Sequence, residues 1–273
     1  MSKYKLIVSD LDETLLGSDH KISDRNAEAI QEAHSQGVKF VPATGRNYKS
    51  VQPMLSRLGL AGEKDEYLIA YNGGAVFENA GNRLLLFEDL PFEAADALYR
   101  RGREYEACVH VYTLEDVYVY NLWDEERRYM KGLMSLIETD APDLGFLRGQ
   151  KILKVLYENE NLPYLHKIEK ELQEDFGTQV DMAYSGNRSL EFTRKGVTKG
   201  AALMQLADRL GIPIENVIAV GDNLNDLSML QAAGIGIAVA NAAPGAKAGA
   251  DITAPWTNDE DAVARILEKY VLD

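Results

Sequence analysis

The chain has 273 residues with ordinary hydrophobic (46%) and charged (26%) fractions, enough for one large or two smaller globular domains. Its 43 acidic and 29 basic residues give a net charge of −14, which argues against a general role on nucleic acids or membrane surfaces. Its single cysteine, Cys108, excludes a disulfide framework and a thiolate metal cluster.

The N-terminal apolar run is short because Asp10 interrupts it, so it lacks the pattern of a signal peptide. No stretch of the sequence reaches the apolar length that a membrane span requires. We therefore expect a soluble, cytoplasmic protein without nucleic-acid or membrane partners.

The first part of the chain alternates strand-like and helix-like segments. The run KLIVSD is short, continuous and apolar, which is typical of a buried parallel strand. Ser23 is the N-cap of the helix that follows, and Gly37 lies just past its end. The expected elements are strand 5–10, helix 23–36, strand and turn 38–46, helix 48–58 and strand 67–74. This alternation predicts a parallel α/β sheet.

The middle of the chain has a different pattern, in which strands follow one another in pairs. The expected elements are strand 84–87, helix 92–105, strands 108–112 and 117–121, helix 125–138, strand 151–158, helix 162–175 and strands 178–185 and 189–194. Paired strands with turn-like gaps indicate an antiparallel sheet with helices on one face.

The strand–helix alternation returns near the end of the chain. The expected elements are helix 197–210, strand 216–222, helix 224–232, strand 235–240, edge strand 251–254 and helix 259–271. The sequence therefore predicts an α/β fold with a Rossmann-like parallel-sheet core, formed by residues 1–81 and 195–273. An α+β domain of residues 82–194 would be inserted into this core.

Polar residues follow four of the expected core strands. In an open parallel sheet, ligands bind at the carboxyl ends of the strands. Any one of these segments would suit a simple turn, but four in one sheet point to a shared ligand site. The segments are Asp10 with Asp12, Thr44-Gly45-Arg46, Asn72-Gly73-Gly74 and Gly221-Asp222-Asn223.

The acidic residues among them would form a dense negative cluster. Mg²⁺ is the natural counter-charge, because it binds oxygen ligands and accepts a few carboxylates together with water and phosphate. No cluster of histidine or cysteine offers a zinc site. A calcium loop does not fit the segment DNLND, since Leu224 occupies its third position and no glycine follows Asp226.

Lys199 is expected in the first turn of a helix, where its charge opposes the helix dipole. A solvated surface lysine is the simple interpretation. Beside a phosphate the position makes sense, because helix N-termini and lysines both attract anions. Gly200 would allow a close approach.

Four segments in order, DLDET, ATGR, TKG and GDNLND, resemble the four motifs of the haloacid dehalogenase-like superfamily. The large insertion between the second and third motifs makes the chain similar to the Cof-type phosphatases, the sugar-phosphatase group. The resemblance implies a Mg²⁺-dependent phosphatase for small phosphorylated metabolites, in particular sugar phosphates, acting through an aspartyl-phosphate intermediate. It also implies that the inserted domain is a mobile cap that chooses the substrate.

The resemblance assigns roles to matching positions. Asp10 would be the nucleophile and a metal ligand, and Asp222 would complete the metal site. Asp12 would be the general acid/base and would offer its backbone carbonyl to the metal. Glu13 is a departure, because the family usually has glycine there.

Other matching positions would bind the phosphate or support the site. The phosphate-binding positions are Leu11, Thr44, Gly45, Lys199 and Asn225. Asp226 would support Lys199 or the metal shell, and Arg46 and Asn72 would lie near the leaving group.

Three other functions compete with this one. A phosphotransferase similar to phosphomannomutases would pass the phosphoryl group to a second sugar. A phosphoprotein phosphatase would act on a protein tail, and the DLDET segment also matches smaller phosphatases of that kind. A regulatory sugar-phosphate binder would be expected to lack one of the carboxylates or Lys199, and all of these are present.

Overall fold

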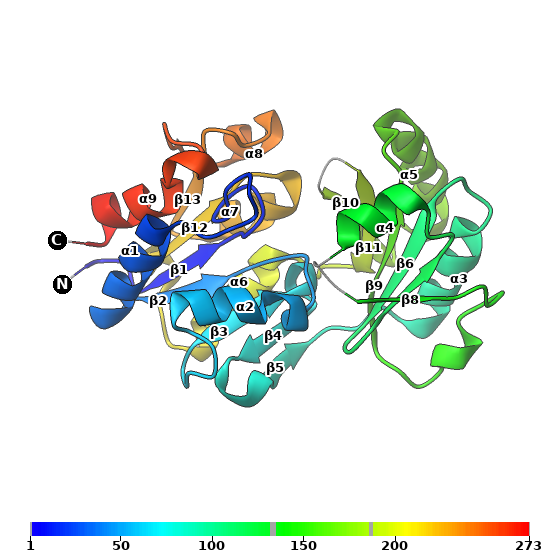
Figure 1. The fold of residues 1–273 in the computed structure, drawn as a ribbon, viewed down its shortest axis with the longest axis horizontal. Coiled ribbons are helices and arrows are strands. Elements are labelled where there is room, and N and C mark those ends of the chain that lie inside the picture. Colours follow the sequence, from blue (N-terminus) through cyan, green and yellow to red (C-terminus); the bar gives the residue numbers. More distant parts are fainter. Residues whose placement is uncertain (1, 132–134, 186–187, 273) are drawn as a thin grey trace. The chain divides into compact units, whose positions relative to one another are not determined.

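The computed structural model describes residues 2–131, 135–185 and 188–272 (Figure 1). Contacts between residues divide the chain into two compact units, Met1–Phe87 with Thr198–Asp273, and Glu88–Val197. The α/β fold predicted from the sequence is confirmed. Among the described residues, no helix combines the length and the apolar character needed to cross a membrane.

The first unit is built on a parallel sheet with the strand order β14-β13-β12-β1-β2. Its central strands are continuous apolar runs that are buried throughout, as expected for strands covered on both faces. The strands are β1 (Leu6–Ser9), β2 (Lys39–Pro42), β12 (Val217–Gly221), β13 (Ile235–Ala238) and β14 (Ile252–Thr253). Because all five are parallel, their carboxyl ends lie at one edge of the sheet.

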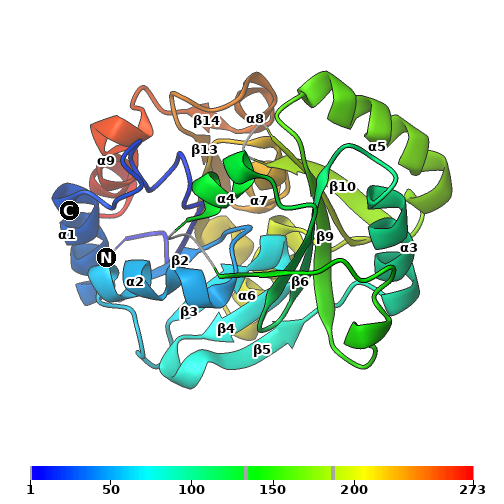
Figure 2. The same cartoon turned by 45° about the vertical axis from the view of Figure 1, so that its right-hand side comes forward.

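Helices of the first unit begin at side-chain caps. Ser23, Asn47 and Thr198 each accept a hydrogen bond from a backbone N–H in the first turn of the helix that they precede. The helices are α1 (Asp24–Ser35), α2 (Tyr48–Leu58), α6 (Lys199–Arg209), α7 (Leu227–Ala232), α8 (Pro244–Gly249) and α9 (Ala262–Tyr270). Helix α1 packs against α9, and α6 packs against α7 (Figures 1 and 2).

The third predicted strand pairs with the parallel sheet through an isolated bridge and belongs mainly to a second sheet. Strand β3 (Tyr67–Ala70) has a single parallel bridge, between Ala43 and Ile69, and then turns back to pair with β4 (Ala75–Glu78). Strand β5 (Arg83–Phe87) completes a three-stranded antiparallel sheet. The first unit therefore extends to residue 87, beyond the predicted domain boundary at 82, because β5 pairs with β4.

The second unit contains a six-stranded sheet with the order β10-β11-β9-β6-β7-β8, antiparallel except for the β7–β8 pair. Its strands are β6 (Cys108–Thr113), β7 (Val117–Tyr120), β8 (Leu136–Glu138), β9 (Ile152–Glu158), β10 (Val180–Ser185) and β11 (Ser189–Arg194). Its helices are α3 (Phe92–Gly102), α4 (Asp124–Met130) and α5 (Leu162–Phe176). That this unit acts as a cap stays a prediction.

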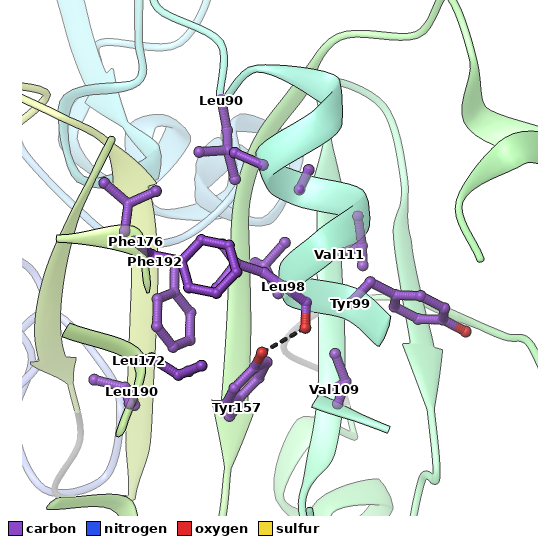
Figure 3. Packing of buried hydrophobic residues seen from close by; sticks show 14 of the residues in the cluster. Leu90, Leu98, Tyr99, Val109, Val111, Tyr157, Leu172, Phe176, Leu190 and Phe192 are labelled. Atoms are coloured by element: carbon purple, nitrogen blue, oxygen red, sulfur yellow. Dashed lines mark hydrogen bonds between the residues drawn. The ribbon is translucent and has the colours of Figure 1, made fainter. Parts of the chain in front are cut away.

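Helices α3 and α5 pack their apolar faces onto this sheet. Figure 3 shows side chains from α3, such as Leu98, beside Val109 and Val111, which share one face of β6 because they are two residues apart. Leu172 of α5 joins the same buried cluster, and the hydroxyl of Tyr157 donates a hydrogen bond to the backbone carbonyl of Leu98. This core holds the second unit together.

The prediction of a helix over 125–138 is wrong in its second half. Helix α4 ends at Met130, and Leu136–Glu138 forms β8, which pairs in parallel with β7. Residues 132–134 lie outside the described residues. The edge of the sheet offers hydrogen bonds to this apolar segment, and such tertiary pairing overrides local helix propensity.

Candidate active site

The site in the first unit is built at the ends of β1 and β12. These strands are parallel neighbours with Ser9 opposite Val220, so Asp10 and Asp222 leave the sheet side by side. A short helical turn, Leu224–Asp226, follows and brings Asp226 back toward them. Carboxylate oxygens of Asp10, Asp222 and Asp226 lie within 4.8 Å of one another, and all three residues are buried.

Lys199 lies between two of these carboxylates. Its Nζ is 2.5 Å from Asp10 Oδ1 and 2.6 Å from Asp226 Oδ1, and its side chain is fully buried. Lys199 is the first residue of α6, directly after the N-cap Thr198. The two acidic partners explain how a buried lysine is tolerated at a helix N-terminus.

Asp226 has a second task in the same turn. Its Oδ2 accepts hydrogen bonds from the backbone N–H groups of Asp222 and Asn223, both at 3.0 Å. Gly221 makes room for it, since a side chain there would come within 2.6 Å of the Asp226 Cβ. Asp226 thus contacts both the turn and Lys199, and its predicted supporting role stays a prediction.

Thr14 is a site residue that the sequence reasoning missed. Its Oγ1 donates a hydrogen bond of 2.8 Å to Asp222 Oδ1, and the side chain is buried. The backbone N–H groups of Leu15 and Leu16 donate hydrogen bonds to the Leu11 carbonyl, which closes this segment into a tight turn. Its position as the last residue of DLDET was the available signal.

The pKa values of the buried acids and of Lys199 are shifted from their ordinary values. Three carboxylates face one ammonium group, and burial raises the pKa of Asp10 well above its usual range, with Lys199 opposing the shift and the other acids adding to it. Burial, reinforced by Asp226, raises the pKa of Asp222 to about 7. Burial alone would lower the pKa of Lys199, but Asp10 and Asp226 reverse this and hold it above its ordinary value.

The cluster suits a hard divalent cation. Its donors are all carboxylate oxygens that can meet at one point, which is the ligand type that Mg²⁺ prefers. Burial raises the pKa of Asp10 and of Asp222, and a bound cation would offset this by favouring the ionised carboxylates. Asp10 and Asp222 could therefore hold a metal ion.

The side chain of Asp12 does not join this cluster. It is 45% exposed and binds the guanidinium of Arg46 through two hydrogen bonds, one of them 2.9 Å from Nε to Oδ2. The predicted contact of Asp12 with the metal runs through its backbone carbonyl and stays a prediction. Arg46 was expected near the leaving group. In the structure its guanidinium binds the carboxylate of Asp12, the proposed acid/base.

Asn72 and Asn225, from different strand ends, meet beside Gly45. The Asn225 Nδ2 donates to Asn72 Oδ1 at 3.2 Å, and a Cβ on Gly45 would lie 3.2 Å from the same oxygen. Tyr71 and Asn72 both have positive φ values, 54° and 56°, which is strained for residues other than glycine. The Asn72 side-chain amide therefore lies beside Asn225 and the loop that carries Gly45.

The remaining phosphate-binding positions differ in what they can offer. Thr44 is anchored, because its backbone N–H bonds to the Ile69 carbonyl at 2.9 Å and its hydroxyl accepts the Arg46 N–H at 3.1 Å. The side chain of Leu11 is buried in the core, so a phosphate could meet only its backbone. These roles stay predictions.

Glu13, the departure from the family pattern, has a left-handed backbone conformation with a φ of 57°. Glycine adopts this conformation without strain, which explains why the position favours it. The Glu13 carbonyl accepts a hydrogen bond of 2.8 Å from the Asn241 side chain, which helps to hold the turn with glutamate present.

In the absence of divalent cations, we expect the free energy of unfolding to fall as the pH rises from about 5 to about 8. Asp222 has a pKa of about 7 in the folded state against an ordinary value of 3.8, so the folded state binds its proton more tightly. This contribution is complete below the ordinary value and is lost as the pH rises through about 7. Thermal melts with EDTA and with Mg²⁺, at both pH values, measure the effect.

Mg²⁺ should raise the melting temperature more at the higher pH, because it binds the ionised carboxylates. Asp222→Asn is the matched control and should flatten the pH dependence of the EDTA-treated protein. An equal Mg²⁺ shift at both pH values, with no change in Asp222→Asn, would contradict this account of the cluster.

The chain is similar to known proteins over most of its length. The family model of haloacid dehalogenase-like hydrolases matches residues 7–267. The 5-amino-6-(5-phospho-D-ribitylamino)uracil phosphatase of Bacillus subtilis is 30% identical, over 98% of this chain and 96% of its own. The HMP-PP phosphatase of Serratia proteamaculans is 29% identical, over 88% of this chain and 85% of its own.

A solved structure gives the same result. A haloacid dehalogenase-like hydrolase from Bacteroides thetaiotaomicron is 31% identical and superposes with a TM-score of 0.84, covering 97% of this chain and 99% of its own.

Proposed function

The chain belongs to the haloacid dehalogenase-like hydrolases, and from this premise we propose that it is a Mg²⁺-dependent phosphatase for small phosphorylated metabolites, above all sugar phosphates. One observation carries the proposal: Asp10, Asp222 and Asp226 converge around Lys199 at the carboxyl ends of the parallel strands. Such a set can neutralise a phosphate and present a carboxylate to it.

Asp10 is the proposed nucleophile. Lys199 engages its Oδ1, and we assign the attack on phosphorus to Oδ2. The attack forms a bond from Asp10 to phosphorus and breaks the bond from phosphorus to the leaving oxygen. The resulting acyl phosphate is activated, so water can remove the phosphoryl group and restore the Asp10 carboxylate.

Asp12 is the proposed general acid/base. In the first step its carboxyl group gives a proton to the leaving oxygen, and in the second its carboxylate takes a proton from the attacking water. One residue can serve both steps because the proton moves in opposite directions. Its partial exposure leaves it accessible from outside the buried cluster.

The remaining charged groups prepare the site for an anion. Lys199 neutralises the phosphate, and Asp226 and Thr14 hold Lys199 and Asp222 in place. A divalent cation held by Asp10, Asp222 and the Asp12 carbonyl would supply the charge stabilisation that lets an anionic nucleophile meet an anionic phosphate.

The substrate class is supported by the relatives. Both are named for small phosphorylated compounds, and both align with most of this chain. We therefore propose a small metabolite as the substrate of this chain as well, with sugar phosphates as the first candidates to assay.

A panel of phosphorylated compounds, assayed with Mg²⁺ and with EDTA, tests the proposal. It should include sugar phosphates, nucleotides, a sugar bisphosphate with an acceptor sugar, and a phosphopeptide. We expect phosphate release from small metabolites, loss of release in EDTA and recovery when Mg²⁺ is restored. Turnover of the phosphopeptide alone, or transfer to the acceptor sugar without phosphate release, would refute it.

A further inference from the structure

The guanidinium of Arg46 binds the carboxylate of Asp12 at two points. The Arg46 Nε lies 2.9 Å from Asp12 Oδ2, and one terminal guanidinium nitrogen donates to Oδ1. Two parallel hydrogen bonds fix the plane of a carboxylate as well as its position. The Arg46 side chain is only 11% exposed, so it is itself packed in place.

Arg46 and Asp12 both lie in loops that are held by hydrogen bonds. The Arg46 N–H donates to Thr44 Oγ1, and the Arg46 carbonyl accepts the Tyr71 N–H, both at 3.1 Å. Asp12 lies in the turn that the Leu11 carbonyl closes by accepting the N–H groups of Leu15 and Leu16. The two loops follow the neighbouring strands β1 and β2. An exposed ion pair between two mobile loops would not hold its side chains in one fixed geometry.

The geometry points to Arg46 as the positioning residue for the proton transfers of Asp12, an inference that rests on the proposed function. Arg46 holds the side-chain carboxyl group in one orientation, from which its protonated form gives a proton to the leaving oxygen and its ionised form then takes a proton from the attacking water. Without two anchoring bonds, the half-exposed Asp12 side chain would sample other rotamers. Misplacement of a reacting group lowers the rate of the chemical step and leaves ground-state binding nearly unchanged.

A double-mutant cycle on the full-length protein tests this inference. The variants are Arg46→Lys, which keeps the charge and loses the planar fork, Asp12→Asn, and both together. With the best substrate of the panel, we expect Arg46→Lys to lower kcat by roughly 10- to 100-fold, with KM changed by less than about threefold. In the Asp12→Asn background the same substitution should have no further effect, because the group that it positions has lost its function.

Two further variants complete the design. Arg57→Lys is the matched control, since Arg57 pairs with Asp24 on the surface and should keep the kcat of the original protein. Arg46→Gln repeats the cycle with a second side chain, and thermal melts verify that each variant is folded.

The outcomes separate the inference from the proposed function. Additive losses of kcat, a raised KM with unchanged kcat, or full activity in both Arg46 variants would overturn the inference while the phosphatase assignment stands. Full activity in Asp12→Asn would overturn the acid/base assignment, and the inference with it.

Discussion

Replacing Asp10 by asparagine is expected to lower kcat by about 10⁴-fold or more, because an amide cannot act as the nucleophile that forms the acyl phosphate. Folding should be preserved, since the asparagine oxygen still accepts the hydrogen bond of Lys199 at Oδ1. One of three buried carboxylates also disappears, which relieves their mutual repulsion. Phosphate-release kinetics and thermal melts of the same preparation measure both effects.

The matched control makes the same chemical change at an exposed acid. Asp24 is 90% exposed at the start of α1, and Asp24→Asn should leave kcat unchanged. Turnover by Asp10→Asn at the rate of the original protein would refute the role of Asp10. Equal losses in Asp10→Asn and Asp24→Asn would show that the effect is not local to the site.

Replacing Lys199 by methionine is expected to reduce both activity and stability. The variant keeps the volume of the side chain but leaves Asp10 and Asp226 buried without their cation. Removing one partner of a buried ion pair costs about 3–5 kcal/mol of unfolding free energy. The phosphate also loses its neutralising group, so kcat/KM should fall by at least about 10³-fold.

Urea denaturation and phosphate-release kinetics check these two effects separately. Lys21→Met is the control, because Lys21 is 80% exposed and pairs loosely with Asp19 at 3.9 Å. Unchanged stability and turnover in Lys199→Met would contradict the assignment of Lys199.

The parallel core could be predicted because its strands are unbroken apolar runs and its helices carry clear caps. The run ending at Ser9 and the run ending at Gly221 became the neighbouring strands β1 and β12, which brings Asp10 and Asp222 together. The arrangement of the acidic cluster followed from one rule, that parallel strands end at the same edge of a sheet.

Side-chain partners inside the loops could not be predicted in the same way. Which group Thr14 or Arg46 meets depends on how each loop turns, and the turn at Glu13 uses a backbone conformation that glutamate rarely adopts. The strand at Leu136–Glu138 was missed for a related reason, because only the edge of a folded sheet makes it a strand.

The most direct test of the central claim is to trap the phosphorylated enzyme. The protein is mixed with a radiolabelled substrate identified by the panel, quenched in acid during turnover and digested, and the labelled peptide is sequenced. The account predicts label on Asp10 when Mg²⁺ is present and none when EDTA is present. Label on another residue, or turnover that continues in EDTA without a labelled peptide, would contradict it.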